Sequence, residues 1–272
     1  MTSSPLPRVG LADMGKLTGL TALVTGGNRG LGFAMALRLL QDGADVVIVG
    51  RNADSVDMAA ENLRVHGRAR GVVADVSTED GLRELFAKVD EFSPRLDILV
   101  NNAGVADEAA FADVTRAGWD RVIGINLSAP FFVAQQAATR MTAGGAIVNI
   151  TSIDAYGADG PFSSYVAAKA GLVGLTKAAA VELAPQGIRV NAVSPGWTLT
   201  DMAAEATSVA MLAHMRSDFG RVPLRRLLTP DEIASAVAYL VSPEASGITG
   251  VDLIVDGGTL ANLYILETLP QE

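Results

Sequence analysis

The chain of 272 residues contains no cysteine and only two histidines, His66 and His214. Without thiols it can form neither disulfide bonds nor thiolate zinc sites, and it has no cysteine nucleophile. Two isolated histidines also argue against a histidine-rich metal centre or a Ser-His-Asp triad, and no metal site is expected. The motifs GxSxG and GxxxxGK[ST] are absent as well. Any proton chemistry must therefore use another side chain, and tyrosine is the remaining candidate.

Positive charge is scarce, because 21 Lys and Arg face 30 Asp and Glu, for a formal net charge of −9. This balance disfavours binding to nucleic acid or to an anionic membrane, since both attract cationic surfaces. No apolar run reaches the roughly 20 residues that cross a bilayer. Residues 1–8 lack the basic-then-apolar pattern of a signal peptide. We expect a cytoplasmic protein without nucleic-acid or membrane partners.

Short apolar runs alternate along the chain with longer amphipathic stretches. The runs are nearly continuous in Val and Ile, as expected for strands buried on both faces, and they lie at 21–25, 45–49, 70–73, 98–101, 146–150, 189–193 and 253–255. Helices are expected at 31–42, 53–65, 79–92, 119–141, 164–183 and 230–241. The alternation predicts a single-domain α/β protein with a doubly wound Rossmann fold, whose seven-stranded parallel sheet carries helices on both faces. We expect the domain at 16–258, after a flexible N-terminal arm (1–15) and before a C-terminal tail (259–272).

A glycine-rich turn joins the first strand to the first helix, in the stretch 25–32, Thr-Gly-Gly-Asn-Arg-Gly-Leu-Gly. Glycines let a backbone approach a phosphate closely, and a helix N-terminus supplies free N–H groups and positive potential. The alternative is a tight packing turn without a ligand. The position in a βαβ unit favours a dinucleotide site. The predicted contacts are Gly26, Asn28, Arg29, Gly30, Leu31 and Gly32.

The second strand ends in Gly50 and Arg51, where dinucleotide sites often place an acid that binds the adenine ribose. An acid would repel a 2′-phosphate, whereas Arg51 can bind one, and Arg29 can add a second positive charge. The alternative is a pair of exposed arginines. The pattern predicts that NADP(H) is favoured over NAD(H).

Tyr165 and Lys169 stand four residues apart in a predicted helix, so they share one helix face. A neighbouring ammonium favours the phenolate, and we expect it to lower the pKa of Tyr165 from its free value of about 10. Ser152 follows the fifth strand and can converge on the same pocket. Asn126, inside a helical stretch, is either a satisfied core amide or a residue that distorts the helix and holds a water.

Further candidates follow the carboxyl ends of other strands, where ligands bind in open α/β sheets. They are Asp75 and Val76 after the third strand, Asn101, Ala103 and Gly104 at the fourth, and Pro195 and Gly196 at the sixth.

Together, these motifs resemble those of the short-chain dehydrogenase/reductase family, in the same order, from about Lys16 to Gly258. The resemblance implies an NAD(P) cofactor and a Ser-Tyr-Lys-Asn catalytic group. It implies that Tyr165 transfers the proton, while Ser152 hydrogen-bonds the substrate oxygen. Lys169 would lower the pKa of Tyr165 and bind the nicotinamide ribose, and Asn126 would anchor a water. Thr198 and Thr200 match positions that contact the nicotinamide.

The substrate is less well marked. Family members place a substrate loop at 197–226, and Asp154, Tyr156, Phe162 and Trp197 are candidate substrate contacts. We expect a free small alcohol or ketone, of the polyol, sugar-acid or secondary-metabolite type.

The enzyme alternative is a 3-oxoacyl-[acyl-carrier-protein] reductase, whose carrier-docking basic residues correspond here to Ala143 and Gln186. Arg221, Arg225 and Arg226 could replace that basic patch. A non-catalytic cofactor sensor or scaffold is a further alternative, but such a protein would be expected to have lost members of the catalytic group.

The sequence continues after Gly258 with a tail that includes Leu260, Leu263, Tyr264 and Ile265. So many large apolar groups exposed together would favour aggregation. We predict a homotetramer in which this tail packs against a neighbouring subunit. Packing against its own subunit is the alternative.

Overall fold

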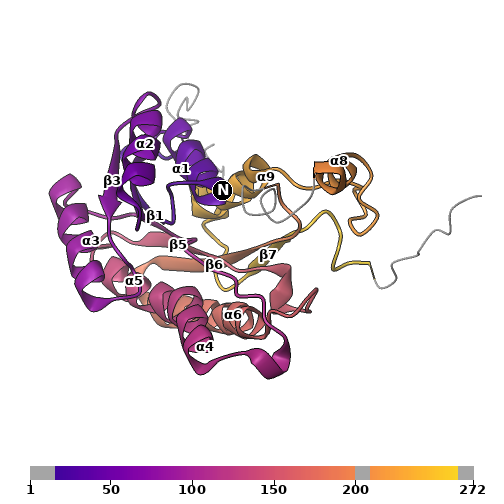
Figure 1. Cartoon of the computed structure of the whole chain (residues 1–272). Helices are drawn as coiled ribbons and strands as arrows, with labels where there is room; N and C mark the ends of the chain where they lie inside the picture. The colour runs from indigo at the N-terminus through magenta and orange to yellow at the C-terminus, as the bar shows by residue number, and fades with distance from the viewer. Residues whose placement is uncertain (1–15, 200–208, 263–272) are drawn as a thin grey trace, which may run out of the picture.

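A computed structural model of the chain describes residues 16–199 and 209–262, and its centre is a seven-stranded parallel sheet (Figure 1). The strand order is β3-β2-β1-β4-β5-β6-β7, and every pairing is parallel. The strands are β1 Thr21–Thr25, β2 Asp45–Gly50, β3 Ala69–Val73, β4 Ile98–Asn101, β5 Gly145–Ile150, β6 Ile188–Pro195 and β7 Asp252–Val255. The predicted fold class is confirmed, and the predicted strands differ from these by a few end residues.

Helices cover both faces of the sheet, as Figure 1 shows. The principal helices are α1 Gly30–Gln41, α2 Ala53–Arg64, α3 Glu79–Phe92, α4 Arg116–Ile123, α5 Ala129–Ala138, α6 Ser163–Leu183, α8 Val209–Ser217 and α9 Pro230–Val241. Helices α1, α2 and α9 pack on one face, and α3, α5 and α6 on the other. Within the described ranges, no helix is long and apolar enough to cross a membrane.

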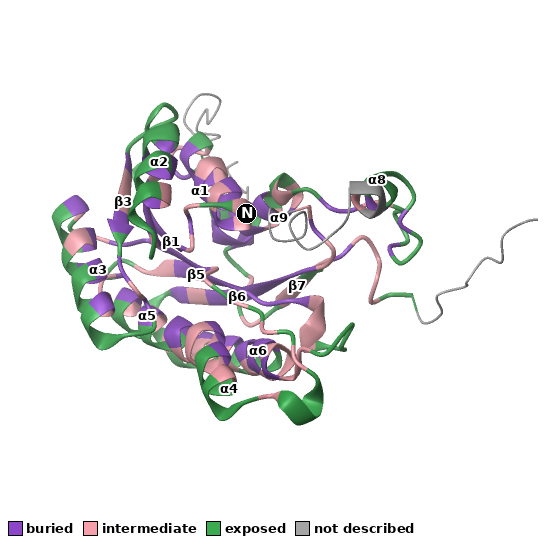
Figure 2. Cartoon of the chain, viewed as in Figure 1, coloured by how far each residue is buried: buried purple, intermediate pink, exposed green. Residues whose placement is uncertain are grey.

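The strands supply both hydrophobic cores, because successive side chains of a strand point to opposite faces. In β1, Val24 belongs to the core under α1 and α9, whereas Leu23 belongs to the core under α3 and α5. Both residues are completely buried, and the inner strands are mostly purple in Figure 2. This double burial explains why the strands read as continuous apolar runs rather than alternating ones.

The predicted helix 119–141 is interrupted, and that prediction needs correcting. A π-helical turn, Gly124–Ser128, separates α4 from α5. Pro130 has no N–H to give to the carbonyl of Asn126, so the regular α-helical ladder cannot continue there. The Asn126 side chain instead bonds the backbone of Val105, donating to its carbonyl (2.7 Å) and accepting from its N–H (2.9 Å). A local backbone constraint and a long-range contact therefore coincide at Asn126.

Several helix starts follow the capping chemistry of the sequence, whereas α1, α5 and α6 have no side-chain cap. Thr229 forms a complete capping box with Glu232 at the start of α9, and Thr78 caps α3 through the N–H of Gly81. Helix α1 has neither a side-chain cap nor an acidic residue in its first turn. Its first N–H groups are thus left for another partner.

Some predicted segments lie outside the described residues. They are the N-terminal arm (1–15), most of the C-terminal tail (263–272) and part of the predicted substrate loop (200–208), which includes Thr200.

The end of β1 is tied to the end of β4 by one hydroxyl group, and this contact is testable. Thr25 Oγ1 accepts hydrogen bonds from the N–H groups of Asn102 (2.9 Å) and Ala103 (3.0 Å). Thr25→Val keeps the shape but leaves both donors without this acceptor. We expect the free energy of unfolding to fall by about 1–3 kcal/mol, measured by urea denaturation. Thr139→Val, at an exposed hydroxyl, is the control, and equal stability losses in the two variants would contradict the assignment.

Candidate functional site

A cleft of about 690 Å³ lies at the carboxyl ends of the strands. It opens beside β1 and β4, where the strand order reverses and open α/β sheets bind their ligands. Most of the predicted site residues line it: Gly26, Asn28, Arg29, Gly30, Leu31, Gly32, Arg51, Asp75, Val76, Ala103, Gly104, Ser152, Tyr165, Lys169, Pro195, Gly196 and Thr198. Residues far apart in the sequence therefore converge on one surface.

The glycine turn has the geometry of an anion cradle. Gly26 and Gly30 have φ values of 63° and 54°, in the left-handed region that favours glycine. A Cβ atom on Gly32 would lie 2.1 Å from the carbonyl oxygen of Gly26, so any side chain there would force the turn open. The uncapped N-terminus of α1 follows this turn. Bare N–H groups and the positive end of the helix dipole together suit a phosphate.

The part of the cleft beside β1 and β2 carries positive charge. Arg29 and Arg51 are exposed and line the cleft, and no ion pair to an acidic side chain is found for either within the described part of the chain. Burial works to raise the pKa of Asp75, but hydrogen bonds from Ser77 and the charge of Arg51 outweigh it and hold that pKa below its usual value. A Cβ atom on Gly50 would lie 2.6 Å from Asn28 Oδ1. The arrangement leaves no room for an acidic side chain at position 50 unless Asn28 and Val56 move.

The prediction for Asn101 needs correcting, because its side chain points into the protein. Its Nδ2 donates to the Pro130 carbonyl (3.1 Å) and to Asn149 Oδ1 (2.9 Å), and Asn101 does not line the cleft. Asn102 lines the cleft instead, and its Nδ2 donates to the carbonyls of Thr25 (2.9 Å) and Gly26 (3.2 Å). Neighbouring residues at a strand end face opposite ways, and composition alone does not say which asparagine faces the ligand.

Ser152, Tyr165 and Lys169 come together on one wall of the cleft. The Lys169 ammonium is buried and donates to the Ile150 carbonyl (2.7 Å), and it lies 5.4 Å from the centre of the Tyr165 ring. Asn126 is also buried and lies behind this wall rather than in it. It holds Val105, and its Oδ1 would be 3.2 Å from a Cβ atom on Gly104.

The prediction that the pKa of Tyr165 is lowered is wrong. Burial raises the pKa of Tyr165 to about 12, a hydrogen bond with Ser152 opposes this rise, and the charges of Asp154 and Asp159 add to it. Burial lowers the pKa of Lys169 to about 8. Both groups have lost the water around them, and loss of water favours their neutral forms more strongly than the ammonium favours the phenolate. A protonated Tyr165 is a proton donor at neutral pH.

None of the four predicted substrate contacts, Asp154, Tyr156, Phe162 and Trp197, lines the cleft, and their contact with a substrate stays a prediction. Tyr156 donates from its hydroxyl to Asp252 Oδ2 (2.7 Å), and Trp197 packs edge-to-face on Phe219, with ring centres 5.4 Å apart. Phe162 is the residue before α6, where it makes no capping hydrogen bond. Asp154 is bonded to Ser152.

Several residues that line the cleft were not predicted. They are Val49, Gly50, Asn52, Ser55, Ala74, Asn102, Val105, Ala106, Ile125, Ile150 and Thr151. Most of them flank a predicted residue, so extending each strand-end motif by one or two positions would have found them. Among residues 16–199 and 209–262, no group of three or more His, Asp or Glu side chains could hold a metal ion.

Known proteins share this fold and sequence over most of the chain. A family model described as enoyl-(acyl carrier protein) reductase matches residues 26–259. The chain is 35% identical to the 3-oxoacyl-[acyl-carrier-protein] reductase of Aquifex aeolicus, over 89% of this chain and 98% of that protein. It is 41% identical to the cis-4-hydroxycyclohexanecarboxylate dehydrogenase of Sinomonas cyclohexanicum, over 88% of this chain and 96% of that protein. A crystal structure of a short-chain type dehydrogenase/reductase from Mycobacterium marinum superposes with a TM-score of 0.85 at 33% identity, over 92% of this chain and 99% of that one.

The cleft fits a nicotinamide dinucleotide on the evidence of its own residues. The glycine turn and the start of α1 would hold the pyrophosphate, since they offer N–H groups without competing side chains. Pro195, Gly196 and Thr198 line the same cleft as Lys169. The Lys169 ammonium has three N–H donors, and one of them bonds the Ile150 carbonyl. The others can bond a ribose hydroxyl.

The buried ammonium of Lys169 should cost stability below pH 8. Its pKa falls from 10.5 to about 8, so the penalty is complete below pH 8 and is lost as the pH rises toward 10.5. Lys169→Met removes the charge, and we expect the free energy of unfolding at pH 7 to rise by about 1–3 kcal/mol, by urea denaturation. This difference from the wild type should shrink by pH 10. Lys177→Met, at an exposed position of α6, is the control. If Lys169→Met were less stable at pH 7 than both the wild type and Lys177→Met, the assigned cost of the buried ammonium would be contradicted.

Proposed function

Because the chain belongs to the short-chain dehydrogenase/reductase family of NAD(P)-dependent oxidoreductases, we propose that it interconverts a secondary alcohol and a ketone on a free small molecule, with NADP(H) as the preferred cofactor. The observation that carries this proposal is the meeting of Ser152, Tyr165 and Lys169 on one wall of the cleft that begins at the glycine turn. Asn126 completes the proposed catalytic group from behind that wall.

Each residue of the group has a role that its surroundings support. When bound, the nicotinamide supplies or accepts the hydride. Tyr165 gives its proton to the substrate oxygen during reduction, and Ser152 donates a second hydrogen bond to that oxygen. Lys169 holds the cofactor ribose. Asn126 fixes Val105 beside the site, and we propose that it also anchors a water.

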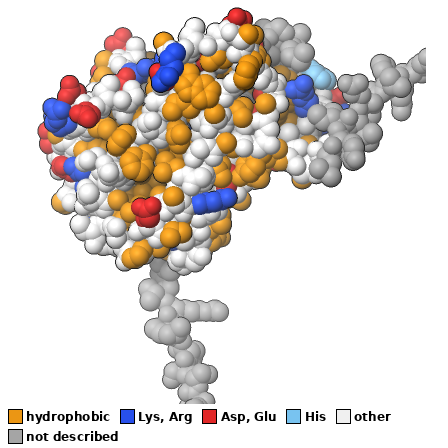
Figure 3. Space-filling view, turned by 90° about the horizontal axis from the view of Figure 1, so that it is seen from below, with side chains coloured by type: hydrophobic (Ala, Val, Ile, Leu, Met, Phe, Trp, Pro, Cys, Tyr) orange, Lys and Arg blue, Asp and Glu red, His pale blue; other side chains and the backbone are white. Residues whose placement is uncertain are grey.

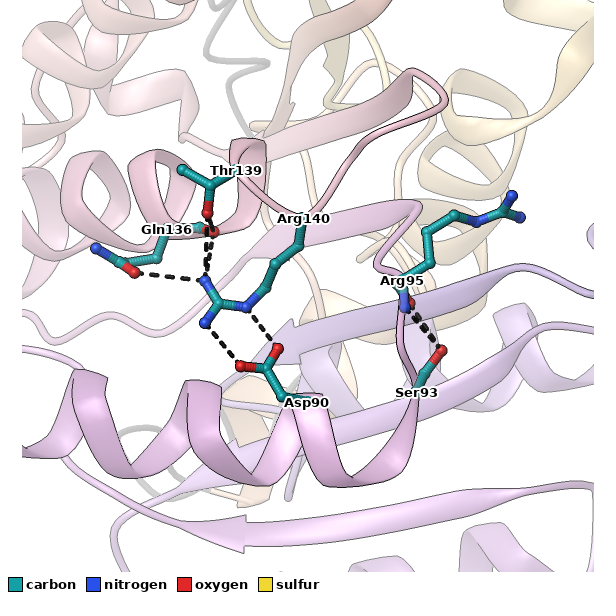
Figure 4. A network of polar contacts seen from close by, with 6 residues as sticks. All are labelled: Asp90, Ser93, Arg95, Gln136, Thr139 and Arg140. Atoms are coloured by element: carbon teal, nitrogen blue, oxygen red, sulfur yellow. Dashed lines mark hydrogen bonds and ion pairs between the residues drawn. The ribbon is translucent and has the colours of Figure 1, made fainter.

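The arginines that could dock an acidic carrier protein have intramolecular partners. Arg225 pairs with Asp218 (2.6 Å), Arg226 pairs with Glu232 (2.8 Å), and Arg221 lies over the Trp197 ring. Near β5, Arg140 pairs with Asp90 (2.7 Å), in the network of Figure 4. Arginines already paired with an acidic side chain attract an acidic partner weakly, and this holds for Arg225, Arg226 and Arg140. These pairs favour a free substrate of the polyol, sugar-acid or secondary-metabolite type over a carrier-bound one.

Assembly as a homotetramer is also part of the proposal. Hydrophobic side chains gather on the face seen from below in Figure 3. Phe131 and Phe132 of α5 and Trp119 of α4 are large apolar residues that are exposed in the single chain. At one edge of the sheet lies β7, where Ile254 is exposed. Contact with further copies of the chain would cover such surfaces. The cytoplasmic location and the packing of the tail stay predictions.

Tyr165→Phe tests the reaction. A screen of polyols, sugar acids and ketones with NADP(H) and NAD(H), followed by absorbance of the reduced nicotinamide, first identifies a substrate. Loss of the Tyr165 hydroxyl should then lower kcat by at least about 100-fold, the low end for general acid catalysis. Cofactor binding, measured by calorimetry, should persist. Tyr239→Phe, on the exposed surface of α9, is the control. A Tyr165→Phe enzyme with nearly normal kcat would rule out the proposed proton donor.

Arg51→Ala tests the cofactor preference. Arg51 lies in the cleft after β2 without an acidic partner at position 50, so its guanidinium is available for a 2′-phosphate. A charge-assisted contact contributes about 1.5–3 kcal/mol, so KM for NADP(H) should rise at least about tenfold, and KM for NAD(H) should hardly change. Arg83→Ala, at an exposed position of α3, is the control, because it removes the same charge outside the cleft. A wild-type enzyme that prefers NAD(H) would refute the preference.

A further inference from the structure

A carboxylate on the last strand ties together the ends of three neighbouring strands. Asp252 Oδ2, on β7, accepts hydrogen bonds from the hydroxyls of Tyr156 (2.7 Å) and Ser194 (2.8 Å). The Ser194 hydroxyl, on β6, lies in turn 2.7 Å from the hydroxyl of Thr151, the residue that follows β5. Segments from four parts of the sequence therefore meet at one acceptor.

The register of the strands brings these side chains to one face of the sheet. Asp252 is paired with Ala192 of β6, and Ser194 lies two residues further along β6, so its side chain points to the same face. Val190 shares this face and belongs to the core under α3 and α5. Polar groups thus replace the apolar core at the end of β6. Since Ser194 is completely buried, its hydroxyl needs the carboxylate as an acceptor.

The network holds both ends of the segment that begins with Ser152. Thr151 precedes Ser152, and Tyr156 follows the 3₁₀ turn Ile153–Ala155. Thr151 and Ser152 line the cleft, whereas Tyr156 and Asp252 do not. The side chain of Tyr156 is half exposed, so its hydrogen bond to Asp252 is an anchor at the far end of the turn. The carboxylate restrains, from outside the cleft, a turn whose start lies inside it.

We propose that Asp252 is a positioning residue of the reaction, which fixes the Ser152 oxygen in the cleft by anchoring the turn that follows it. This inference rests on the proposed alcohol–ketone chemistry, in which Ser152 bonds the substrate oxygen. The anchor sets only where the oxygen lies, because the hydroxyl proton of a serine rotates to the acceptor at hand. Rates depend steeply on such placement, since a misplacement of about 1 Å can cost about 100-fold.

Two substitutions at Asp252 test the anchor. Asp252→Ala removes the acceptor, so kcat should fall at least about tenfold. The Kd of the cofactor, measured by calorimetry, should hardly change, because the glycine turn and Lys169 are untouched. Asp252→Asn keeps an oxygen that can accept from both hydroxyls, and its kcat should stay within about threefold of the wild type. Asp57→Ala, at an exposed position of α2, is the control. Wild-type kcat in Asp252→Ala would overturn the proposal.

A double substitution separates positioning from a general loss of stability. If Asp252 acts through Ser152, the two residues are coupled and their effects on kcat are not additive. Asp252→Ala should then lower kcat by less than about twofold in a chain that already carries Ser152→Ala. A merely structural role would lower kcat by the same factor in both backgrounds, and that result would contradict the proposed positioning.

Tyr156→Phe provides a milder variant, in case Asp252→Ala does not fold. It keeps the ring and leaves the bond between Ser194 and Asp252 in place, and it removes only the anchor at the far end of the turn. We again expect a fall in kcat of about tenfold with an unchanged Kd for the cofactor. Tyr239→Phe, on the exposed surface of α9, is the control. Equal kcat values in the two variants would refute the anchor.

Hydrogen exchange needs no substrate, so it separates this proposal from the proposed function. Within the turn, the Ala155 N–H donates to the Ser152 carbonyl (3.0 Å). The Tyr156 N–H donates to the Ile153 carbonyl (2.9 Å). In Tyr156→Phe these two amides should exchange at least about tenfold faster, while the amides of β1 exchange as in the wild type. Unchanged exchange would overturn the anchor even in an active enzyme. Faster exchange in a chain that turns over no carbonyl compound would support the anchor and refute the proposed function.

Discussion

The pairing of β1 with β4 is the constraint on which the site depends. From β1 the chain passes through α1 to β2, on one side of the sheet, and from β4 it passes through α4 and α5 to β5, on the other. Helices α1 and α5 lie on opposite faces of the sheet. A crevice therefore opens at the carboxyl ends of these two neighbouring strands. The hydroxyl of Thr25 closes its floor by accepting hydrogen bonds from both residues that follow β4.

Burial that stabilises the fold also sets the chemistry of the cleft. Lys169, Tyr165 and Asp154 lie close together. Their pKa values are shifted to about 8, 12 and 6 respectively, and each shift favours the neutral form of the group. Burial is the largest cause for all three, because a region with little water disfavours charge of either sign. The ammonium of Lys169 is compensated in part by the Ile150 carbonyl. A neutral phenol beside a cation with free donors suits carbonyl reduction at neutral pH.

Much of this arrangement was predictable from patterns that short stretches of sequence carry. The strands were found because burial on both faces produces uninterrupted Val and Ile. The glycine turn was found because its left-handed residues, Gly26 and Gly30, admit few alternatives. The break between α4 and α5 was missed, although Pro130 marks it, because the amphipathic pattern continues across the π-helical turn. The wrong asparagine was chosen after β4, because Asn101 and Asn102 differ only in the direction of their side chains.

The sequence by itself determined the fold class and the order of the candidate site residues along the chain, because both depend on residue type and spacing. The Ser-Tyr-Lys-Asn group followed from the family resemblance that this order carries. The tertiary structure decided the features that depend on contacts between segments far apart in the sequence. It turned Tyr156 toward Asp252 and Trp197 onto Phe219, away from the cleft, and it placed Asp154 against Ser152. It also reversed the expected shift of the Tyr165 pKa. Loss of water depends on every segment packed around a group, and no single stretch of sequence contains that information.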